Sequence, residues 1–274
     1  MSDHRLNQAP LGREVSYPST YDAGLLFPIE RAVNRGSLPY SGPWHGADIW
    51  NAYEVSWLNR RGLPRAAIAR FIVPADSPHL IESKSLKLYL NSLNEERYDS
   101  AADVAALLSA DLGKVAGARV EVQLNDDLAT LKVACHPLAG TCLDDLDAQI
   151  TRYEPDPSLL RLAQVGETVT ETLVSNLLKS NCPVTGQPDW GSVQVRYTGP
   201  RLDPTSLLKY IVSFRRHTEF HEHCVERMYC DLWQLLQPQA LFVMARYTRR
   251  GGLDINPWRS SHPMQVEDER TPRQ

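Results

Sequence analysis

The sequence predicts an α+β protein in which the same order of strands and helices occurs twice. Stretches in which apolar and polar residues alternate are typical of half-buried strands. They are mixed with stretches whose apolar residues recur every three or four positions, as in helices that cover a sheet. Each half has the order strand, strand, helix, helix, strand. The chain has 274 residues, of which 42% are hydrophobic and 23% charged, so it can bury a sizeable core.

The first half carries five predicted elements. A turn at Gly62-Leu63-Pro64 separates two apolar stretches and indicates a hairpin, and Gly117 is suited to end a helix. The predicted elements are strands at 47–58 and 66–73, a helix starting at Ser83, a helix at 100–115, and a strand at 118–124.

The second half repeats this order. The predicted elements are strands at 168–177 and 191–197, helices at 204–216 and 220–236, and a strand at 240–247. Residues 126–166 contain several turn-forming residues and are the predicted connector, and the polar tail from Ser260 is predicted to be loose. No residue-by-residue repeat links the halves. Two modules, at 1–135 and 136–274, are therefore predicted from element order alone.

Composition narrows the function classes. A formal net charge of -4 provides no cationic field for sequence-independent binding to nucleic-acid phosphates. The first 15 residues lack the apolar segment of a signal peptide, and no apolar run approaches the roughly 18 residues that span a bilayer. Five cysteines, an odd number, fit a reducing compartment. We therefore expect a cytoplasmic protein with no membrane partner and no direct nucleic-acid partner.

The first candidate for chemistry is Cys182, in a turn-rich loop at 179–190 that also contains Asp189. A free thiol has a pKa near 8.5, so a useful nucleophile needs a base, a cation or a helix N-terminus nearby. Asp189, seven positions on, can exchange a proton with it. Taken alone, Cys182 fits a small buried thiol in a turn better, because free cysteine is among the most buried residue types.

A second candidate lies at the start of the helix near residue 220, in the run Phe220-His221-Glu222-His223-Cys224. The free N–H groups of a helix N-terminus can orient a polar ligand. His221 and Cys224 could instead join Cys182 in a three-ligand zinc site, although Val225 breaks the HExxH spacing of metalloproteases. From spacing alone, zinc and metal-free catalysis are equally compatible, and a helix-capping cluster is the third reading.

Two further runs could bind a phosphorylated ligand. Glu82-Ser83-Lys84 opens a helix with a carboxylate, a hydroxyl and a cation, although from spacing alone a capped helix with a solvated lysine face is the better explanation. Arg249-Arg250-Gly251-Gly252 combines guanidinium groups with exposed backbone N–H groups, where a surface charge run is the default interpretation. No G-x-G-x-x-G or Walker motif is present, so any dinucleotide would bind without a Rossmann unit.

Together these runs resemble one family. The sequence Glu82-Ser83-Lys84-Ser85-Leu86-Lys87-Leu88-Tyr89 and the runs at 180–183, 187–190, 220–222 and 249–259 are similar to those of the long, two-module QueF family. Its members are NADPH-dependent 7-cyano-7-deazaguanine reductases of the queuosine pathway. The resemblance extends from Leu11-Gly12 to Arg259. It implies a tunnelling fold, with two tandem β-β-α-α-β-β modules whose antiparallel sheets carry helices on the outer face and whose sites lie between modules.

The resemblance also implies residue roles. Cys182 would attack the nitrile carbon to give a thioimide, and Asp189 would supply a proton. The implied substrate-binding residues are Ile81, Glu82, Ser83, His221 and Glu222. The implied NADPH-binding residues are Ser83, Lys84, Arg250 and Gly251. The implied chemistry uses two NADPH per nitrile and no metal, in a homodimer whose partner is a small-molecule deazapurine nitrile.

Two alternatives have different chemistry. A zinc-dependent cyclohydrolase shares the tunnelling fold and uses cysteine and histidine ligands, but in the QueF family His221 and Cys224 do not hold zinc. A non-catalytic purine-binding or tRNA-interacting module would keep the fold without the reaction. The presence of both Cys182 and Asp189 argues against that second alternative.

Overall fold

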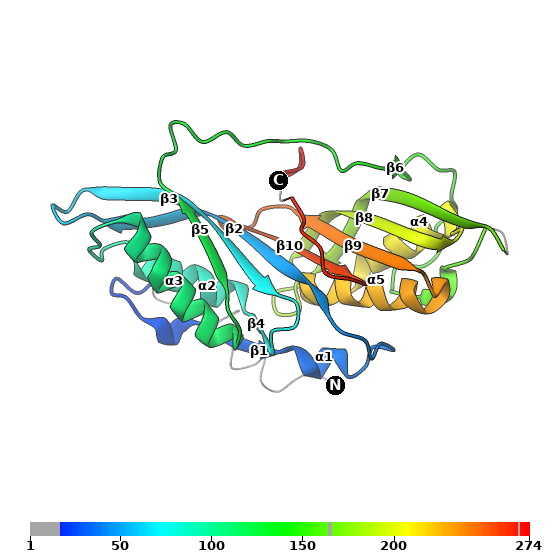
Figure 1. Cartoon of the computed structure of the whole chain (residues 1–274), viewed down its shortest axis with the longest axis horizontal. Helices are drawn as coiled ribbons and strands as arrows, with labels where there is room; N and C mark the ends of the chain where they lie inside the picture. The colour runs from blue at the N-terminus through cyan, green and yellow to red at the C-terminus, as the bar shows by residue number, and fades with distance from the viewer. Residues whose placement is uncertain (1–16, 164–165, 268) are drawn as a thin grey trace. The chain divides into compact units, whose positions relative to one another are not determined.

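The computed structural model describes residues 17–163, 166–267 and 269–274. Leu11 and Gly12, where the family resemblance begins, lie outside the described residues. The chain divides into two compact units (Figure 1). The first unit contains the chain up to Val33, Asp48–Val133 and Arg249–Asp254, and the second contains Asn34–Ala47, Ala134–Thr248 and Ile255–Gln274.

The first unit is an α+β structure with two helices on a sheet. Its strands and helices are β1 (Pro28–Glu30), most of β2 (His45–Leu58), β3 (Pro64–Pro74), β4 (His79–Ile81), α2 (Ser83–Ser92), α3 (Ala101–Ala116) and β5 (Glu121–Asn125). The strand order is β5-β3-β2, β3 pairs antiparallel with β5, and β1 and β4 form a separate antiparallel pair. Helix α1 (Arg31–Arg35) continues the chain from the first unit into the second.

The ends of α3 follow the expected capping chemistry. The Ser100 side chain accepts a hydrogen bond from the backbone N–H of Asp103 at the start of the helix. Gly117 ends the helix with a left-handed φ of 69°, a conformation that glycine adopts without steric cost. Leu108 and Leu112 on this helix are fully buried, so the alanine-rich stretch packs one apolar face against the unit's core.

The second unit carries the longer strands. Its elements are β6 (Thr141–Cys142), β7 (Thr168–Asn181), β8 (Pro188–Pro200), α4 (Pro204–Ser213), α5 (His221–Leu236), β9 (Ala240–Tyr247) and most of β10 (Leu253–Ser260). The strand order is β10-β9-β8-β7-β6, with antiparallel pairs throughout except β6 and β7. Both helices cover one face of this sheet (Figure 1). The odd-numbered residues of β9, such as Val243 and Tyr247, face those helices in a continuous apolar core.

The predicted strands at 168–177 and 191–197 were too short. In the structure β7 reaches Asn181 and β8 begins at Pro188, so the hairpin connection is much shorter than the loop predicted at 179–190. Asp189 therefore lies on a strand. The polar residues at these strand ends gave no periodic apolar signal, but antiparallel backbone pairing continues through them regardless of side-chain type.

Two other features of the second half differ from the prediction. Residues 253–260 form β10, a sixth element that apolar periodicity did not predict, although the β-β-α-α-β-β order implied by the family resemblance includes it. The tail after Ser260 is tied to the second unit, because the His136 amide donates to the Arg270 carbonyl at 2.9 Å and the Gln274 side chain donates to the Tyr247 carbonyl at 3.0 Å. Backbone-directed hydrogen bonds hold this polar segment, and composition does not reveal them.

A buried ion cluster connects α5 to the rest of the second unit. Glu226 on α5 accepts from Arg259 on β10 at 2.7 Å and from Arg35 at 2.6 Å. The side chains of Glu226 and Arg259 are fully buried. Burial alone would raise the pKa of Glu226, but the Arg259 and Arg35 guanidinium groups lower it to about 2. The carboxylate thus stays charged in the interior.

Within the described residues, no helix has both the length and the apolar character needed to cross a lipid bilayer.

Removing this carboxylate should destabilise the fold. We expect Glu226→Gln to lower the free energy of unfolding by about 3–5 kcal/mol, because two guanidinium groups lose their counter-charge in the interior. Urea denaturation measures the change. The matched control is Glu167→Gln, in the exposed pair with Arg201 at 2.9 Å, which should cost about 0–1 kcal/mol.

The same carboxylate should make stability depend on pH. Because folding lowers the pKa of Glu226 from 4.5 to about 2, its contribution is present above pH 4.5 and is lost as the pH falls towards 2. Urea midpoints of the wild type and Glu226→Gln should therefore converge as the pH is lowered. A constant difference down to the lowest folded pH would contradict this assignment.

Candidate active site

The β7–β8 hairpin places Cys182 and Asp189 on one face of the sheet. Ser180 pairs directly with Asp189 across the two strands, and the Cys182 amide donates to the Gln187 carbonyl at 2.9 Å. Directly opposed residues, and residues two apart along a strand, point to the same side. Ser180, Cys182 and Asp189 therefore share the face that α5 covers, since Leu178 and Val193, which share their alternation, belong to the core under the helices.

Backbone hydrogen bonds fix the start of α5 beside this hairpin. The Asn181 amide donates to the His217 carbonyl at 2.8 Å, and the Glu219 amide donates to the Asn181 carbonyl at 3.1 Å. The residue that precedes Cys182 is thus joined to the segment that precedes His221. Burial lowers the pKa of His217 to about 4, so this neighbouring imidazole is neutral at physiological pH.

The first residue of α5 contacts the hairpin carboxylate. His221 Nε2 lies 3.3 Å from Asp189 Oδ2, and the Asp189 side chain is 3% exposed. The His221 ring stacks on the Tyr247 ring, with centroids 3.9 Å apart and planes inclined by 18°. Glu222, the next residue of the first turn, is also buried. The Asp189 carboxyl group and the His221 imidazole therefore meet at the start of α5, and the buried Glu222 follows in the same helical turn.

The thiols of the second unit have different environments. Cys182 is partly exposed, whereas Cys224 and Cys230 on α5 are buried. Burial raises the pKa of Cys230 to about 12 and raises that of Cys224 further. A buried thiol that stays protonated is a poor nucleophile, so of the three cysteines on the hairpin and α5, Cys182 is the one best placed to react. All five cysteines are free thiols.

The zinc alternative required His221, Cys224 and Cys182 to converge on one ion. In the part of the chain that the structure describes, no group of three or more His, Cys, Asp or Glu side chains is arranged to hold a metal. The buried Cys224 thiol lies instead beside the Ser180 and Tyr247 hydroxyl groups.

Glu82 caps helix α2 in the first unit. It is fully buried, and its two carboxylate oxygens accept from the backbone N–H groups of Lys84 at 2.9 Å and Ser85 at 2.7 Å. Burial raises its pKa, and these two hydrogen bonds oppose the increase. Ile81 ends β4 directly before it, and Ser83 and Lys84 open the helix. The local structure thus matches the capped-helix interpretation, and a carboxylate with about four lone-pair sites can still accept further donors.

The predicted phosphate-binding run forms a tight turn in the first unit. The Arg250 amide donates to the Leu253 carbonyl at 2.8 Å, and Gly251 and Gly252 have φ values of 56° and 75°. A Cβ on Gly251 would lie 3.1 Å from Lys87 Nζ, so the turn lies directly against α2. A pocket of about 290 Å³ opens there, and its lining residues include Lys87, Asn91, Asn94, Gly251 and Gly252.

The predicted residues therefore form two groups. In the second unit the structure brings together Cys182, Asp189, His221 and Glu222. In the first unit it brings Ile81, Glu82, Ser83 and Lys84 to the start of α2, and Arg250 and Gly251 to a turn against the same helix. Sequence reasoning did not identify Tyr247, because no local pattern shows that a residue on β9 would stack on the first residue of α5.

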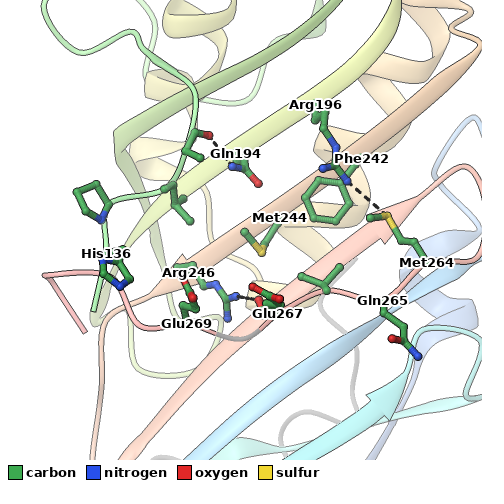
Figure 2. Close-up of a pocket in the computed structure, with 14 residues that line it drawn as sticks. His136, Gln194, Arg196, Phe242, Met244, Arg246, Met264, Gln265, Glu267 and Glu269 are labelled. Carbon is green, nitrogen blue, oxygen red and sulfur yellow. Dashed lines mark hydrogen bonds between the residues drawn. The ribbon is translucent and has the colours of Figure 1, made fainter. Parts of the chain in front are cut away.

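Another pocket lies on the opposite face of the second sheet and contains none of the predicted residues. Gln194 and Arg196 of β8 and Phe242, Met244 and Arg246 of β9 line its floor (Figure 2). These even-numbered positions point away from the helices, in contrast to the core residues beside them. The tail lies over this floor, where Arg246 Nη2 donates to the Glu267 carbonyl at 2.9 Å.

Comparison with known proteins identifies the family. A family model described as nitrile reductase, 7-cyano-7-deazaguanine-reductase N-term, matches residues 17–124, and one described as QueF-like protein matches residues 188–265. A protein from Bordetella avium named NADPH-dependent 7-cyano-7-deazaguanine reductase is 57% identical over 93% of this chain and 94% of its own length.

Two further relatives carry the same name. The protein from Bordetella pertussis is 55% identical over 98% of this chain and 99% of its own length. The protein from Chromohalobacter salexigens is 56% identical over 94% of both chains. With family models covering both halves and relatives of this identity along nearly its whole length, the chain belongs to the QueF family of 7-cyano-7-deazaguanine reductases.

Proposed function

We propose that this protein reduces the nitrile 7-cyano-7-deazaguanine to the aminomethyl compound with NADPH, through a covalent thioimide on Cys182. One observation carries the mechanism: a partly exposed thiol and the Asp189 carboxyl group share one face of a hairpin, and the His221 imidazole lies 3.3 Å from that carboxyl group. A nucleophile, a proton donor and a group that orients the donor are what addition to a nitrile requires.

The first half of the reaction uses both hairpin residues. The Cys182 sulfur forms a bond to the nitrile carbon as one carbon–nitrogen π bond breaks, and the nitrogen takes a proton to give the thioimide. NADPH, when bound, supplies a hydride for each two-electron reduction. Asp189 is placed to hold the proton that the nitrogen accepts, and the 3.3 Å contact from His221 Nε2 orients its carboxyl group. Loss of the Cys182 sulfur from the reduced carbon then frees the thiol.

The buried carboxyl groups are suited to binding the deazaguanine ring. Neighbouring N–H and amino donors on a purine-like edge can both be accepted by one carboxylate. Glu222 and Glu82 are buried acceptors of this kind, and we assign Ile81, Ser83 and His221 to the same substrate. A site with buried acceptors rejects an analogue lacking those donors by roughly 10⁴-fold, because the acceptors would be left without partners.

The residues of the first unit fit a phosphorylated dinucleotide. The Gly251-Gly252 turn has no room for side chains: a Cβ on Gly251 would lie 3.1 Å from Lys87 Nζ, and one on Gly252 would lie 2.6 Å from the Glu54 carboxyl carbon, which shares the adjoining pocket. Arg250 and the α2 lysines supply positive charge. We assign Ser83, Lys84, Arg250 and Gly251 to NADPH binding, with Lys87 at the wall of the adjoining pocket.

We further propose a tandem tunnelling fold with modules at 1–135 and 136–274, acting as a cytoplasmic homodimer without direct nucleic-acid contact. The strand-strand-helix-helix-strand-strand order of β7, β8, α4, α5, β9 and β10 supports this fold for the second module. The free thiols are compatible with a reducing compartment.

The overall reaction is tested by its stoichiometry. Purified protein mixed with 7-cyano-7-deazaguanine and NADPH should oxidise two NADPH for each amine formed, because reduction of a nitrile to an amine takes four electrons. Absorbance of NADPH and mass spectrometry of the product give the ratio. A ratio of one would contradict the four-electron scheme, and binding of the nitrile without NADPH oxidation would favour a non-catalytic binding module.

The nucleophile is tested by intact-protein mass. Without NADPH the wild type should gain the mass of the nitrile, whereas Cys182→Ala should show neither the adduct nor NADPH oxidation. Cys142→Ala, which changes an exposed thiol, is the matched control and should react as the wild type does. An adduct that survives in Cys182→Ala would identify a different nucleophile.

Asp189→Asn separates addition from proton transfer. The amide keeps the shape of the carboxyl group but cannot deliver a proton, so NADPH turnover should fall by about 10²–10⁴-fold. The pH dependence of single-turnover reduction should change with it. Unchanged turnover would show that another group holds the proton.

A further inference from the structure

Tyr247 packs against His221 of the candidate site, although the sequence predicted no role for it. Its ring is fully buried at the end of β9, and the His221 imidazole stacks on it with 3.9 Å between centroids. The planes are inclined by only 18°, so the two rings overlap face to face. A stacked aromatic ring restricts both the rotation and the tilt of an imidazole. The single 3.3 Å contact between His221 and Asp189 leaves those motions free.

Gly191 lies directly beside the Tyr247 ring. Gly191 is paired with Tyr247 between β8 and β9, and a Cβ there would lie 3.2 Å from Tyr247 Cδ1. Gly191 has no left-handed φ, so the absence of a side chain matters for space and not for backbone conformation. The Tyr247 ring therefore fills space that a side chain at position 191 would need, and the His221 ring stacks on it.

The backbone of Tyr247 is held from several directions. Tyr247 pairs with Gly191 in the antiparallel ladder between β8 and β9. Its carbonyl accepts a hydrogen bond from the Gln274 side chain at 3.0 Å. The next residue continues the pairing, since the Thr248 amide donates to the Trp190 carbonyl at 2.8 Å. A ring carried by such a fixed strand end is a rigid support, in contrast to one carried by a loop.

The Tyr247 hydroxyl group has a different environment from its ring. It lies beside the Ser180 hydroxyl and the Cys224 thiol. Burial, with Cys224 and Asp189 nearby, raises the pKa of Tyr247 well above its usual value, so the phenol stays neutral. The hydroxyl thus interacts with Ser180 and Cys224 and the ring with His221, so phenylalanine at this position removes the first set of contacts and keeps the second.

We infer that Tyr247 is a positioning residue for the reduction: its ring, seated over Gly191, fixes the imidazole of His221 against the Asp189 carboxyl group. This inference rests on the proposed function, in which Asp189 holds the transferred proton. The stacking acts through His221 and does not require Tyr247 to touch the substrate.

The test compares Tyr247→Leu, which removes the ring, with Tyr247→Phe, which keeps it. The His221 ring-proton resonances of ¹³C-histidine-labelled protein, assigned with His221→Gln, report the stack directly. In Tyr247→Leu they should move downfield as the ring current is lost, and in Tyr247→Phe they should stay close to the wild type. Activity should follow the same order: kcat should fall by roughly 10–100-fold in Tyr247→Leu, because a misplaced imidazole no longer orients Asp189, and KM should rise as well, because His221 is also assigned to the substrate.

Tyr197→Leu is the matched control for lost core packing. Tyr197 is a fully buried tyrosine on the adjacent strand, and its hydroxyl bonds to Glu171, away from the site. This variant should be destabilised without movement of the His221 resonances. If Tyr247→Leu lowers kcat no more than Tyr197→Leu does, or leaves the resonances unmoved, the inference is wrong.

A second variant keeps the test decisive if Tyr247→Leu does not fold. Gly191→Ala keeps the tyrosine at position 247. The added methyl group requires the Tyr247 ring to move by a few tenths of an ångström. The His221 resonances should move and kcat should fall, and an unchanged protein would overturn the inference. Failure of the proposed function is distinguishable, because a wild type that forms no nitrile adduct and oxidises no NADPH would still show the stacked resonances.

Discussion

The placement of helix α5 depends on the buried ion cluster of Glu226, Arg35 and Arg259. Charges in an interior are stable only when they are paired, and this carboxylate is contacted by one guanidinium group from β10 and another from Arg35, the last residue of α1. Glu226 lies little more than one helical turn after His221 and Glu222. The cluster therefore fixes the axial position of the residues that face the hairpin.

The hairpin provides the complementary constraint. Antiparallel pairing determines which residues of β7 and β8 share a face, and a shift of one residue would turn Asp189 away from the helices. The bonds between Asn181 and the segment at 217–219 then join the hairpin to the start of α5. Cys182, Asp189 and His221 are thus brought near one another by backbone hydrogen bonds, and their own side-chain contacts refine the geometry.

The element types were largely predictable from the sequence. Apolar periodicity predicted the helices near 83, 101, 204 and 221, and the strand at 240–247 was predicted at its observed bounds. Periodicity was less informative at polar strand ends, which is why β7 and β8 were predicted too short and β10 was interpreted only as a phosphate-binding run. Backbone pairing extends strands through such residues because the backbone donors and acceptors are the same for each of them.

The sequence by itself determined the family, because runs such as Glu82-Ser83-Lys84 and the Cys182 hairpin occur together in one order. The residue types in these runs also determine which chemical groups are available. It also determined that Cys182 has a carboxyl group close to it along the chain. Only the tertiary structure decided that Glu82 caps α2, that Cys224 is a buried thiol, and that Tyr247 supports His221. These relations join residues far apart in the chain or depend on burial, and burial is a property of the packed molecule.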